Sequence, residues 1–453
     1  MNATLTFAAE SMQGILHGDD RSFDGVSTDS RTIRAGELFV ALSGPNFDGN
    51  KFVSQARGKG AAAAVVNSLA DEDIAQIEVE DTRLALGQLA ASWLNQHSPT
   101  VVGITGSNGK TTLKEMTAAC LSEVAPTLAT QGNLNNDIGM PLMMSRVDSS
   151  HKFVVLEMGA NHAGEIAYLT SLAKPGVVVI TNAAAAHLEG FGTVDGVARA
   201  KAEILQDESR PDVAILNADD EFYSYWMSLV EGVDVLSFGL SDNADIRADQ
   251  IEAGKEHTHF TLHLLETTIE LTLPLAGIHN VRNACAAAAV ATSLDVSPQD
   301  IKQALEALPP VAGRLQPLDG QNGSTLFDDS YNANPLSVVA AAEFLATLPG
   351  KSWFVLGDMF ELGDDADRLH EEVGAAIRNA GVERLLTLGE MSRGAASGFG
   401  EGASTFVSVE GLVAGLQAEI ADDVNLLVKG SRGMRMERVV DAMRAEAPLR
   451  KAN

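Results

Sequence analysis

The segment GITGSNGKTT at residues 103–112 combines residue types that bind the phosphate groups of a nucleotide. It follows the apolar run TVV and runs into the helix-like stretch TLKEMTAACL, so a glycine-punctuated loop is expected between a strand and a helix. The backbone N–H groups of such a loop, with the positive end of the helix, attract phosphate oxygens. Lys110 has the reach to contact the terminal phosphates, and the Thr111 hydroxyl suits a magnesium ion. The segment predicts a protein that uses ATP or GTP.

One position departs from the general phosphate-loop pattern, which has a glycine five residues before the Gly-Lys pair. Ile104 occupies that position here, and the nearest glycines are Gly103 and Gly106. An ordinary strand–turn–helix connection is therefore the alternative interpretation. The order of strand, loop, Lys-Thr pair and helix favours phosphate binding.

A carboxylate stands at the end of a second apolar run. Glu157 closes the run FVVLE, and in an open α/β sheet ligands bind beyond the carboxyl ends of the strands. A nucleotide site needs a carboxylate, directly or through water, for its magnesium ion. Glu157 is therefore a candidate second magnesium ligand, and a solvated loop carboxylate is the alternative.

Lys201 has an unusual position in the helical pattern TVDGVARAKAEILQ. It lies four residues after Val197 and four before Leu205, so it shares the apolar face of the helix. A lysine held there loses hydration, which lowers its pKa and leaves a neutral amine for covalent chemistry. The alternative is a lysine whose stem packs inward while its ammonium group extends to water.

Other polar residues are less informative alone. His187, in a loop after an apolar strand, is an acid–base or ligand candidate or a bystander. Asn280 and Asn283 open an Ala-rich helix, where one is expected to cap the helix and the other to be available for nucleotide recognition. Arg314 follows a Pro-Pro pair, where a hinge arginine can clamp phosphates or remain exposed. The cluster KGSRGMRME at 429–437 is an anion-site candidate or a helix start with surface charges.

Composition excludes several classes of protein. The 453 residues include 32 basic and 61 acidic ones, a formal net charge of −29, so a nucleic-acid or anionic-membrane partner is not expected. The N-terminus lacks the pattern of a secretory signal, and the apolar runs are too short to cross a bilayer. The two cysteines, Cys120 and Cys285, fall in helical patterns and are expected to be buried thiols. These features indicate a soluble, cytoplasmic protein.

The chain alternates strands and helices, which predicts an α/β fold with three domains. A small N-terminal α/β domain is expected over 1–81, and a helix capped by Asp81 or Thr82 leads into the phosphate loop. A central P-loop-type domain with a mostly parallel sheet is expected over 82–312, with antiparallel strands added between about 244 and 273. A Rossmann-like C-terminal domain is expected over 313–453.

Taken together, these motifs resemble the Mur ligase family, essentially end to end. The resemblance rests on TGSNGKTT, LEMGANHAGEI, TNAAAAHLEGFG with ARAKAEI, GIHNVRNACAAA, AGR, FDDSYNANP and LVKGSRGMRME. Within the family, FDDSYNANP and TQGNLNNDIGMPL look like the members that add D-alanyl-D-alanine to UDP-N-acetylmuramoyl-tripeptide. The resemblance implies an ATP-dependent amide ligase of peptidoglycan synthesis, hence of cell-wall biogenesis, cell shape and cell division. It also implies an acyl-phosphate intermediate, a closing C-terminal domain and a monomer without membrane insertion.

The resemblance also assigns roles to residues. ATP, two magnesium ions and carbon dioxide, as a carbamate on Lys201, are the implied cofactors. Catalysis is assigned to Lys110, Lys201, His187 and Arg314, and metal binding to Thr111, Glu157, His187 and Lys201. Nucleotide binding is assigned to Gly106, Ser107, Asn108, Gly109, Lys110, Thr111, Thr112, Asn283, Arg314 and Asp329. Substrate recognition is assigned to Asp29, Ser30, Arg31, Gly44, Asn133, Asn135, Asn136, Tyr331, Asn332, Asn334, Lys429 and Arg432.

Two alternatives stay open from the sequence. A related amide ligase, such as a folate-polyglutamating enzyme, shares the phosphate loop, but FDDSYNANP and the N-terminal segment speak against it. A P-loop ATPase that joins no substrates usually ends its second strand in aspartate, whereas the candidate strand here ends in Glu157.

Overall fold

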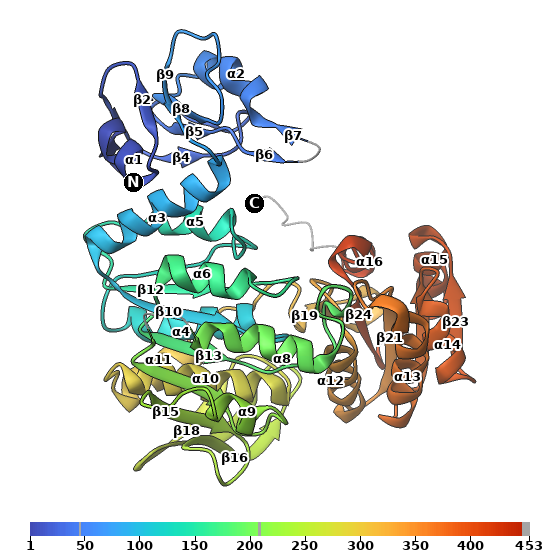
Figure 1. The fold of residues 1–453 in the computed structure, drawn as a ribbon. Helices are drawn as coiled ribbons and strands as arrows, with labels where there is room; N and C mark the ends of the chain where they lie inside the picture. Colours follow the sequence, from blue (N-terminus) through green and yellow to red (C-terminus); the bar gives the residue numbers. More distant parts are fainter. Residues whose placement is uncertain (45–46, 207–209, 446–453) are drawn as a thin grey trace, which may run out of the picture.

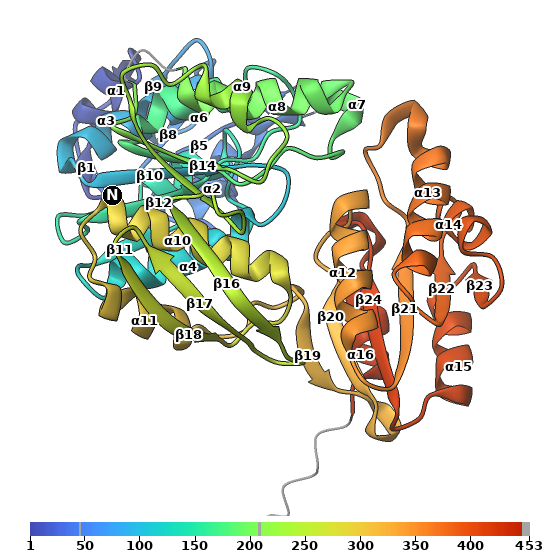
Figure 2. The ribbon, with the colours of Figure 1, turned by 90° about the horizontal axis from the view of Figure 1, so that it is seen from below.

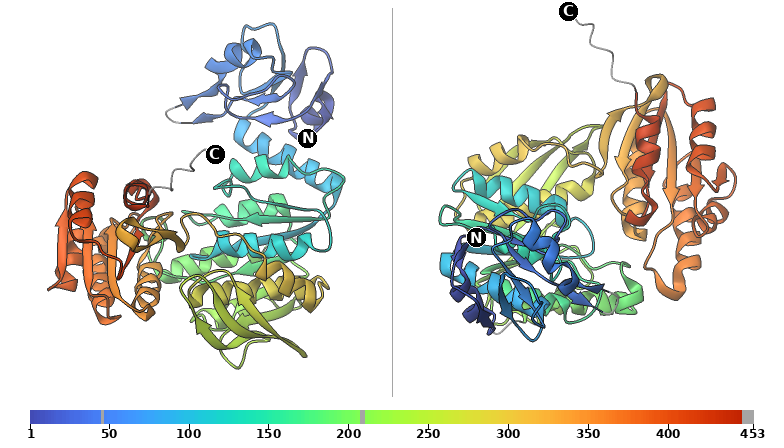
Figure 3. Two further views of the ribbon diagram at one scale, coloured as in Figure 1. Left: turned by 180° about the vertical axis from the view of Figure 1, so that it is seen from behind. Right: turned by 90° about the horizontal axis from the view of Figure 1, so that it is seen from above.

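The computed structural model describes residues 1–44, 47–206 and 210–445. Three large sheets follow one another along the chain, each with its own helices, and the fold is mixed α/β. The N-terminal and C-terminal parts both flank the central part (Figures 1 and 3). Among the described residues, no helix is both long enough and apolar enough to cross a membrane.

The N-terminal part is built on a five-stranded sheet of order β2-β9-β8-β5-β4. Its elements are β1 (Ala3–Thr4), α1 (Leu5–Ser11), β2 (Ile15–His17), β3 (Ser22–Phe23), β4 (Val26–Ser27), β5 (Leu38–Val40), β6 (Ser43–Gly44), β7 (Phe47–Asp48), α2 (Val53–Gly58), β8 (Ala63–Val66) and β9 (Ala75–Glu78). Strands β1 and β3, and β6 and β7, form two small antiparallel pairs outside this sheet.

Helix α3 (Thr82–His97) joins the N-terminal and central parts. Asp81 caps it, as predicted, by accepting hydrogen bonds from the backbone N–H groups of Arg83 and Leu84. The first half of the helix packs into the N-terminal core, through residues such as Leu86, and the second half packs into the central core through residues such as Trp93. The two parts therefore share a helix that contributes side chains to both cores.

The central part holds a nine-stranded sheet of order β11-β12-β10-β13-β14-β15-β16-β17-β18, parallel from β11 to β16 and antiparallel beyond. The strands are β10 (Thr100–Thr105), β11 (Thr127–Ala129), β12 (Phe153–Glu157), β13 (Val177–Ile180), β14 (Val213–Asn217), β15 (Asp234–Gly239), β16 (Ile246–Ala253), β17 (Thr258–Leu264) and β18 (Thr267–Leu273). The helices are α4 (Lys110–Ser122), α5 (Gly139–Met144), α6 (Glu165–Ala173), α7 (Leu188–Phe191), α8 (Val194–Ala202), α9 (Tyr223–Met227), α10 (Ile278–Ser293) and α11 (Pro298–Glu306).

Side chains of this sheet alternate between two hydrophobic cores, as a sheet covered on both faces requires. Val102 and Ile104 of β10 point into the core formed with α4, α10 and α11, whereas Val101 points into the core formed with α3, α5, α6 and α8. Cys120 and Cys285 are both free and buried in the first of these cores, as the sequence predicted.

The C-terminal part contains a six-stranded sheet of order β19-β20-β24-β21-β22-β23, parallel except for β19. Its elements are β19 (Gln316–Asp319), β20 (Thr325–Asp329), α12 (Pro335–Thr347), β21 (Lys351–Gly357), α13 (Ala366–Asn379), β22 (Arg384–Leu388), α14 (Ser392–Phe399), β23 (Ala403–Phe406), α15 (Val409–Glu419), β24 (Val424–Lys429) and α16 (Glu437–Met443). Figure 2 shows the C-terminal part beside the central part, with β19 near the connection between them. The carboxyl ends of β20, β21 and β24 carry the loops that reach the central part.

Candidate active site between the central and C-terminal parts

The phosphate loop lies between β10 and α4, where the sequence predicted it. Gly109 caps α4 with φ 81°, and Gly106 has φ 143°, both in the range that favours glycine. A Cβ atom would lie 1.8 Å from Thr181 Oγ1 at Gly106 and 2.5 Å from Asn283 Oδ1 at Gly109. Only glycine fits these two positions. No side chain caps the N-terminus of the 13-residue helix α4, so its first backbone N–H groups are available to an anion.

The end of β13 holds the loop in place. The Asn108 N–H donates to Asn182 Oδ1 at 3.0 Å, and the Asn108 carbonyl accepts from Thr181 Oγ1 at 2.7 Å. Asn182 lies two residues beyond the end of β13. Its contacts show that it fixes the shape of the phosphate loop.

Lys110 lies at the first position of α4 and turns back over the loop. Its Nζ donates to the carbonyl oxygens of Gly106, at 2.6 Å, and Ser107, at 3.3 Å. Burial lowers the pKa of Lys110; the nearby Glu157 carboxylate raises it, and the Arg314 guanidinium lowers it further. The ammonium group thus sits on the loop that would cradle the phosphates.

Thr111 and Glu157 face each other at the end of the sheet. Thr111 Oγ1 donates to Glu157 Oε2 at 2.9 Å, and Asn135 Nδ2 donates to Glu157 Oε1 at 2.8 Å. A buried carboxylate beside a hydroxyl is a set of oxygen donors, which magnesium prefers. This pair fits a magnesium ion. The described residues contain no group of three His, Cys, Asp or Glu side chains arranged for a metal, so protein ligands alone would not complete such a site.

The C-terminal part reaches the same loop. Arg314 Nη2 donates to Thr111 Oγ1 at 3.2 Å while its guanidinium lies 4.1 Å from the centre of the Tyr331 ring. Asn334 caps α12 and its Nδ2 also donates to Asn108 Oδ1 at 2.8 Å. Two polar contacts therefore join the C-terminal part to the phosphate loop directly.

Lys429 organises the loop that follows β20. Its Nζ donates to Asp329 Oδ2 at 2.6 Å and to the Asn332 carbonyl at 3.0 Å. The Arg432 N–H donates to Asn332 Oδ1 at 3.3 Å, and its guanidinium lies 5.9 Å from the Tyr331 ring. Two cations thus stand beside the loop that carries Tyr331 and Asn332.

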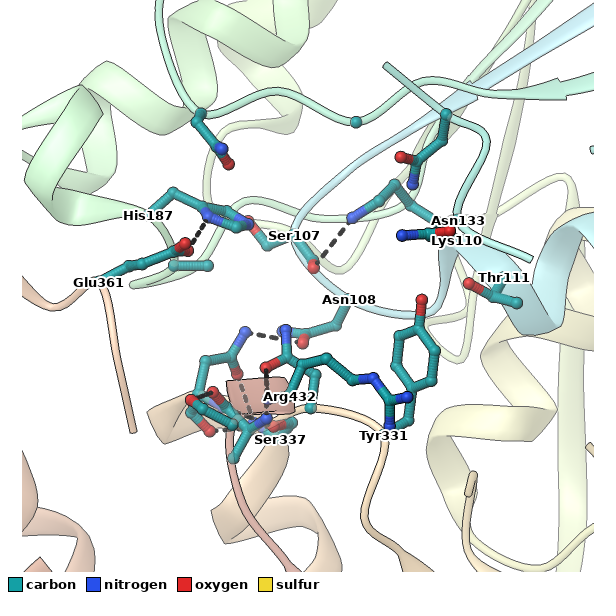
Figure 4. A pocket seen from close by; sticks show the side chains of 18 of the residues that line it. Ser107, Asn108, Lys110, Thr111, Asn133, His187, Tyr331, Ser337, Glu361 and Arg432 are labelled. Atoms are coloured by element: carbon teal, nitrogen blue, oxygen red, sulfur yellow. Dashed lines mark hydrogen bonds and ion pairs between the residues drawn. The ribbon is translucent and has the colours of Figure 1, made fainter. Parts of the chain in front are cut away.

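These residues surround a cavity of about 390 Å³ between the two parts. Figure 4 shows Tyr331, Ser337 and Arg432 of the C-terminal part across from Ser107, Lys110 and Thr111 of the central part. The predicted site residues on its wall are Ser107, Asn108, Gly109, Lys110, Thr111, Asn133, Asn135, Asn136, Glu157, His187, Arg314, Tyr331, Asn332, Asn334, Lys429 and Arg432. Residues far apart in the sequence therefore form one polar site.

Other predicted site residues lie off this wall. Gly106 lies in the loop, and Thr112 lies in α4 behind the loop. Asp329 accepts a hydrogen bond from Lys429. In the N-terminal part, Arg31 pairs with Asp29 at 2.9 Å, and Ser30 Oγ donates to Gln55 Oε1 at 2.8 Å. Asp29, Ser30, Arg31 and Gly44 do not line the cavity in the part of the chain that the structure describes.

The capping role predicted for Asn280 or Asn283 is wrong. Gly277 is the N-cap of α10 and no side chain caps the helix. Asn280 Nδ2 instead donates to the Ala276 carbonyl at 2.8 Å, and Asn283 Nδ2 donates to Asn280 Oδ1 at 3.3 Å. The Asn283 side chain lies against Gly109, in the space that a Cβ atom at position 109 would need.

Lys201 points inward, as the resemblance to the Mur ligase family implied, whereas its helical position alone left the placement of the ammonium group open. It lies in α8 with 1% of its surface exposed, and its Nζ lies 5.2 Å from the centre of the Phe191 ring. Burial lowers the pKa of Lys201 to about 7, and the nearby Lys110 lowers it too, whereas Glu203 and Glu165 raise it. The alternative, an ammonium group that extends to water, is wrong. Lys201 lies behind the cavity wall and not on it.

His187 lies on the wall, and its Nδ1 contacts Oε2 of Glu361 from the C-terminal part (Figure 4). Sequence reasoning missed Glu361, together with the wall residues Phe360 and Ser337. A signal for Glu361 was present, because it closely follows the apolar strand SWFVLG and so stands beyond the carboxyl end of a strand.

Replacing Lys201 by methionine is expected to stabilise the fold at low pH. The pKa of Lys201 is about 7 in the folded chain and 10.5 is its ordinary value. The buried charge therefore costs stability fully below pH 7, and the cost disappears as the pH rises towards 10.5. Urea unfolding in buffer freed of carbon dioxide should show a gain on the order of 4 kcal/mol for Lys201→Met at pH 6.5 and much less at pH 9.5.

Lys114 offers a matched control for this measurement. It is equally buried, but its Nζ donates to Glu115 Oε1 and to the Thr130 carbonyl, both at 2.6 Å. Lys114→Met should lower stability, because it leaves the Thr130 carbonyl buried without this donor. A loss of stability in Lys201→Met at pH 6.5 would show that burial does not lower the pKa of Lys201.

The chain has three α/β parts with one polar cavity between the central and C-terminal parts, and comparisons with known proteins show that it is a ligase and identify its family. The family models described as Mur ligase family, catalytic domain; Mur ligase middle domain; and Mur ligase, glutamate ligase domain match residues 22–94, 104–291 and 313–432. The chain belongs to the Mur ligase family.

Within this family, the chain is 43% identical over 449 residues to UDP-N-acetylmuramoyl-tripeptide--D-alanyl-D-alanine ligase of Escherichia coli (strain K12), covering 98% of each chain. Its structure is similar to that of MurF from Acinetobacter baumannii, with a TM-score of 0.92, 36% identity and coverage of 97% of this chain and 98% of that one. The MurF ligase from Thermotoga maritima, solved in complex with ADP, has a TM-score of 0.82 at 27% identity, with coverage of 92% and 96%.

Proposed function

We propose that this protein adds D-alanyl-D-alanine to UDP-N-acetylmuramoyl-tripeptide with hydrolysis of ATP to ADP and phosphate, a step of peptidoglycan precursor synthesis. The relatives that match nearly the whole chain carry this activity in their names. The observation that carries the proposal is the shared cavity, in which the phosphate loop faces the Tyr331–Asn334 segment. A ligase needs a nucleotide-binding loop and an acceptor-binding segment in one cavity, so that the nucleotide and the acceptor can react with the same substrate.

The chemistry follows from charge. The terminal carboxylate of the tripeptide attacks the γ-phosphorus of ATP, and the bond from that phosphorus to ADP breaks. Two anions about 4 Å apart repel by roughly 4 kcal/mol at an effective dielectric constant near 20. Lys110 and Arg314, which both lie on the cavity wall, offset part of this repulsion. The product is an acyl phosphate.

The second half of the reaction forms the amide. The free amine of D-alanyl-D-alanine attacks the acyl carbon, a proton leaves the nitrogen, and the tetrahedral intermediate releases inorganic phosphate. Water would hydrolyse the acyl phosphate, so the cavity must be closed during this step. The contacts of Arg314 with Thr111 and of Asn334 with Asn108 support a role of the C-terminal part in that closure.

Magnesium and a lysine carbamate belong to this proposal. Thr111 and Glu157 would hold magnesium, which neutralises phosphate charge when bound. His187 is the third residue on the wall that the proposal assigns to metal binding. Lys201 is suited to carboxylation, because its buried amine is neutral above pH 7 and a neutral amine is the form that takes up carbon dioxide.

The remaining assignments concern the ends of the substrates. Tyr331, Asn332 and Asn334, with Lys429 and Arg432, would recognise the dipeptide. Asp29, Ser30, Arg31 and Gly44 would recognise the UDP group from the N-terminal part, and Asn283, Arg314 and Asp329 would serve the nucleotide. We further propose that residues 1–81, 82–312 and 313–453 are the three domains and that the enzyme acts as a monomer.

The test is a reaction of the purified protein with ATP, magnesium, UDP-N-acetylmuramoyl-tripeptide and an acceptor. Mass spectrometry should detect UDP-N-acetylmuramoyl-pentapeptide with D-alanyl-D-alanine, and ADP should accumulate in equal amount. D-Alanine, L-glutamate and a folate with glutamate are the comparison substrates. Turnover with glutamate alone would indicate a different amide ligase, and full ATP hydrolysis without any acceptor would indicate an ATPase.

A further inference from the structure

Glu361 and His187 meet across the boundary between the C-terminal and central parts. His187 is the N-cap of α7, and Glu361 lies in the loop between β21 and α13. Besides the contact of Nδ1 with Oε2, the Glu189 N–H donates to the Glu361 carbonyl at 3.3 Å. The contact thus joins a carboxylate and an imidazole.

Both residues have a backbone conformation that residues other than glycine rarely adopt. The φ angle is 54° at His187 and 64° at Glu361. A left-handed conformation is unfavourable for such residues, so the surrounding structure must hold each of them there. Strained residues that contact each other on the wall of a cavity indicate a functional constraint.

Helix α7 is the element that the C-terminal part contacts here. Leu188 packs against the central core on one side and against the C-terminal core on the other. A Cβ atom at Gly190 would lie 1.9 Å from the Asn161 carbonyl oxygen, and one at Gly196 would lie 2.1 Å from the Phe191 carbonyl oxygen. The close packing at these glycines fixes α7 to its neighbours in the central part. The C-terminal part therefore contacts α7 directly at His187 and Leu188, so its docking can affect the position of His187.

We propose that Glu361 is a positioning residue for His187, so that docking of the C-terminal part on α7 selects the tautomer and orientation of the imidazole ring. A carboxylate that accepts from Nδ1–H leaves the lone pair on Nε2, on a residue of the cavity wall. That lone pair can bind a metal ion or accept a hydrogen bond from metal-bound water. Carboxylates that orient a ligand histidine in this way commonly support metal sites. This inference rests on the proposed function, because it concerns the metal of the nucleotide.

The tautomer can be measured without metal, nucleotide or turnover. In protein labelled with 15N-histidine, two-bond 1H–15N correlations distinguish the Nδ1–H and Nε2–H forms, and the spectrum of His187→Gln assigns the signals. Wild-type His187 should show the Nδ1–H form. Glu361→Ala should shift it towards the Nε2–H form that a free imidazole prefers, and Glu361→Gln, which keeps an acceptor oxygen, should retain more of the Nδ1–H form.

Turnover provides the second readout. Glu361→Ala should lower kcat about 10- to 100-fold, with a smaller loss in Glu361→Gln. Glu390, an exposed residue two positions beyond the end of the neighbouring strand β22, is the matched control, and Glu390→Ala should change neither the tautomer nor kcat. An unchanged His187 tautomer in Glu361→Ala would overturn the proposal. So would a loss confined to the KM for the dipeptide, which would make Glu361 a substrate contact.

If the wild-type chain makes no pentapeptide, the proposed function is wrong, but the tautomer measurement still decides whether Glu361 positions His187. The two failures are therefore distinguishable.

Discussion

Lys110→Ala is expected to reduce ligase turnover by about 10³-fold or more. Lys110 supplies an ammonium group at the phosphate loop, where Nζ already contacts the carbonyl oxygens of Gly106 and Ser107. In the proposed reaction this charge offsets the repulsion between the attacking carboxylate and the γ-phosphate, which is strongest in the transition state. The loss should therefore appear mainly in kcat. Binding of an ATP analogue, measured by calorimetry, should weaken as well.

Two further variants separate chemistry from folding. Lys110→Met keeps the aliphatic stem and removes only the charge, so it should lose turnover as severely while retaining its thermal unfolding temperature. Lys152→Ala removes an exposed lysine just before β12, outside the cavity, and should have wild-type turnover. Substantial activity in both Lys110 variants would refute the assignment of residues 103–112 as the phosphate loop.

Periodicity and loop chemistry predicted a large part of this structure, because those signals are local. The spacing of Lys201 between Val197 and Leu205 placed it on the buried face of its helix, and the structure confirms that burial. Asp81 precedes a long helical pattern and caps α3. In each case the outcome depended on residues within two helical turns.

Short strands were harder to predict. Strands β11, β19 and β23 contain three or four residues each, too few to show a period of two. Each lies beside a longer strand that pairs with it, so pairing across the sheet decides its conformation. Propensity within such a segment carries little of that information.

The contacts between the central and C-terminal parts could not be predicted from the sequence, for a different reason. Asn334 looked like a dipeptide-recognition candidate, but its side chain also contacts Asn108, 226 residues earlier in the chain. Glu361 belongs to the same class, since its partner His187 lies in another part. Such pairs depend on how the parts dock, which no pattern within either segment records. The resemblance to a family supplied roles for single residues but not these pairings.

Lys201→Ala is expected to lower turnover by at least about 10²-fold, because it removes the amine that the proposal assigns to carboxylation. The proposed carbamate adds an anion behind the cavity wall, near Lys110. Its formation requires the neutral amine, whose fraction rises with pH through the Lys201 pKa of about 7. Wild-type turnover at limiting carbon dioxide should therefore increase from pH 6 to pH 8, and added bicarbonate should increase it further.

Rescue distinguishes a missing anion from a damaged fold. In Lys201→Ala the lost side chain leaves a buried space in which a small carboxylate such as formate or acetate can sit, so added carboxylate should restore part of the activity. Lys201→Met has the same loss of function but fills that space with an apolar chain, so the same additives should not help it. Wild-type activity in Lys201→Ala would remove the carbamate from the mechanism. Equal rescue of both variants would show that the carboxylate acts elsewhere, because only the alanine variant has room for it beside Phe191.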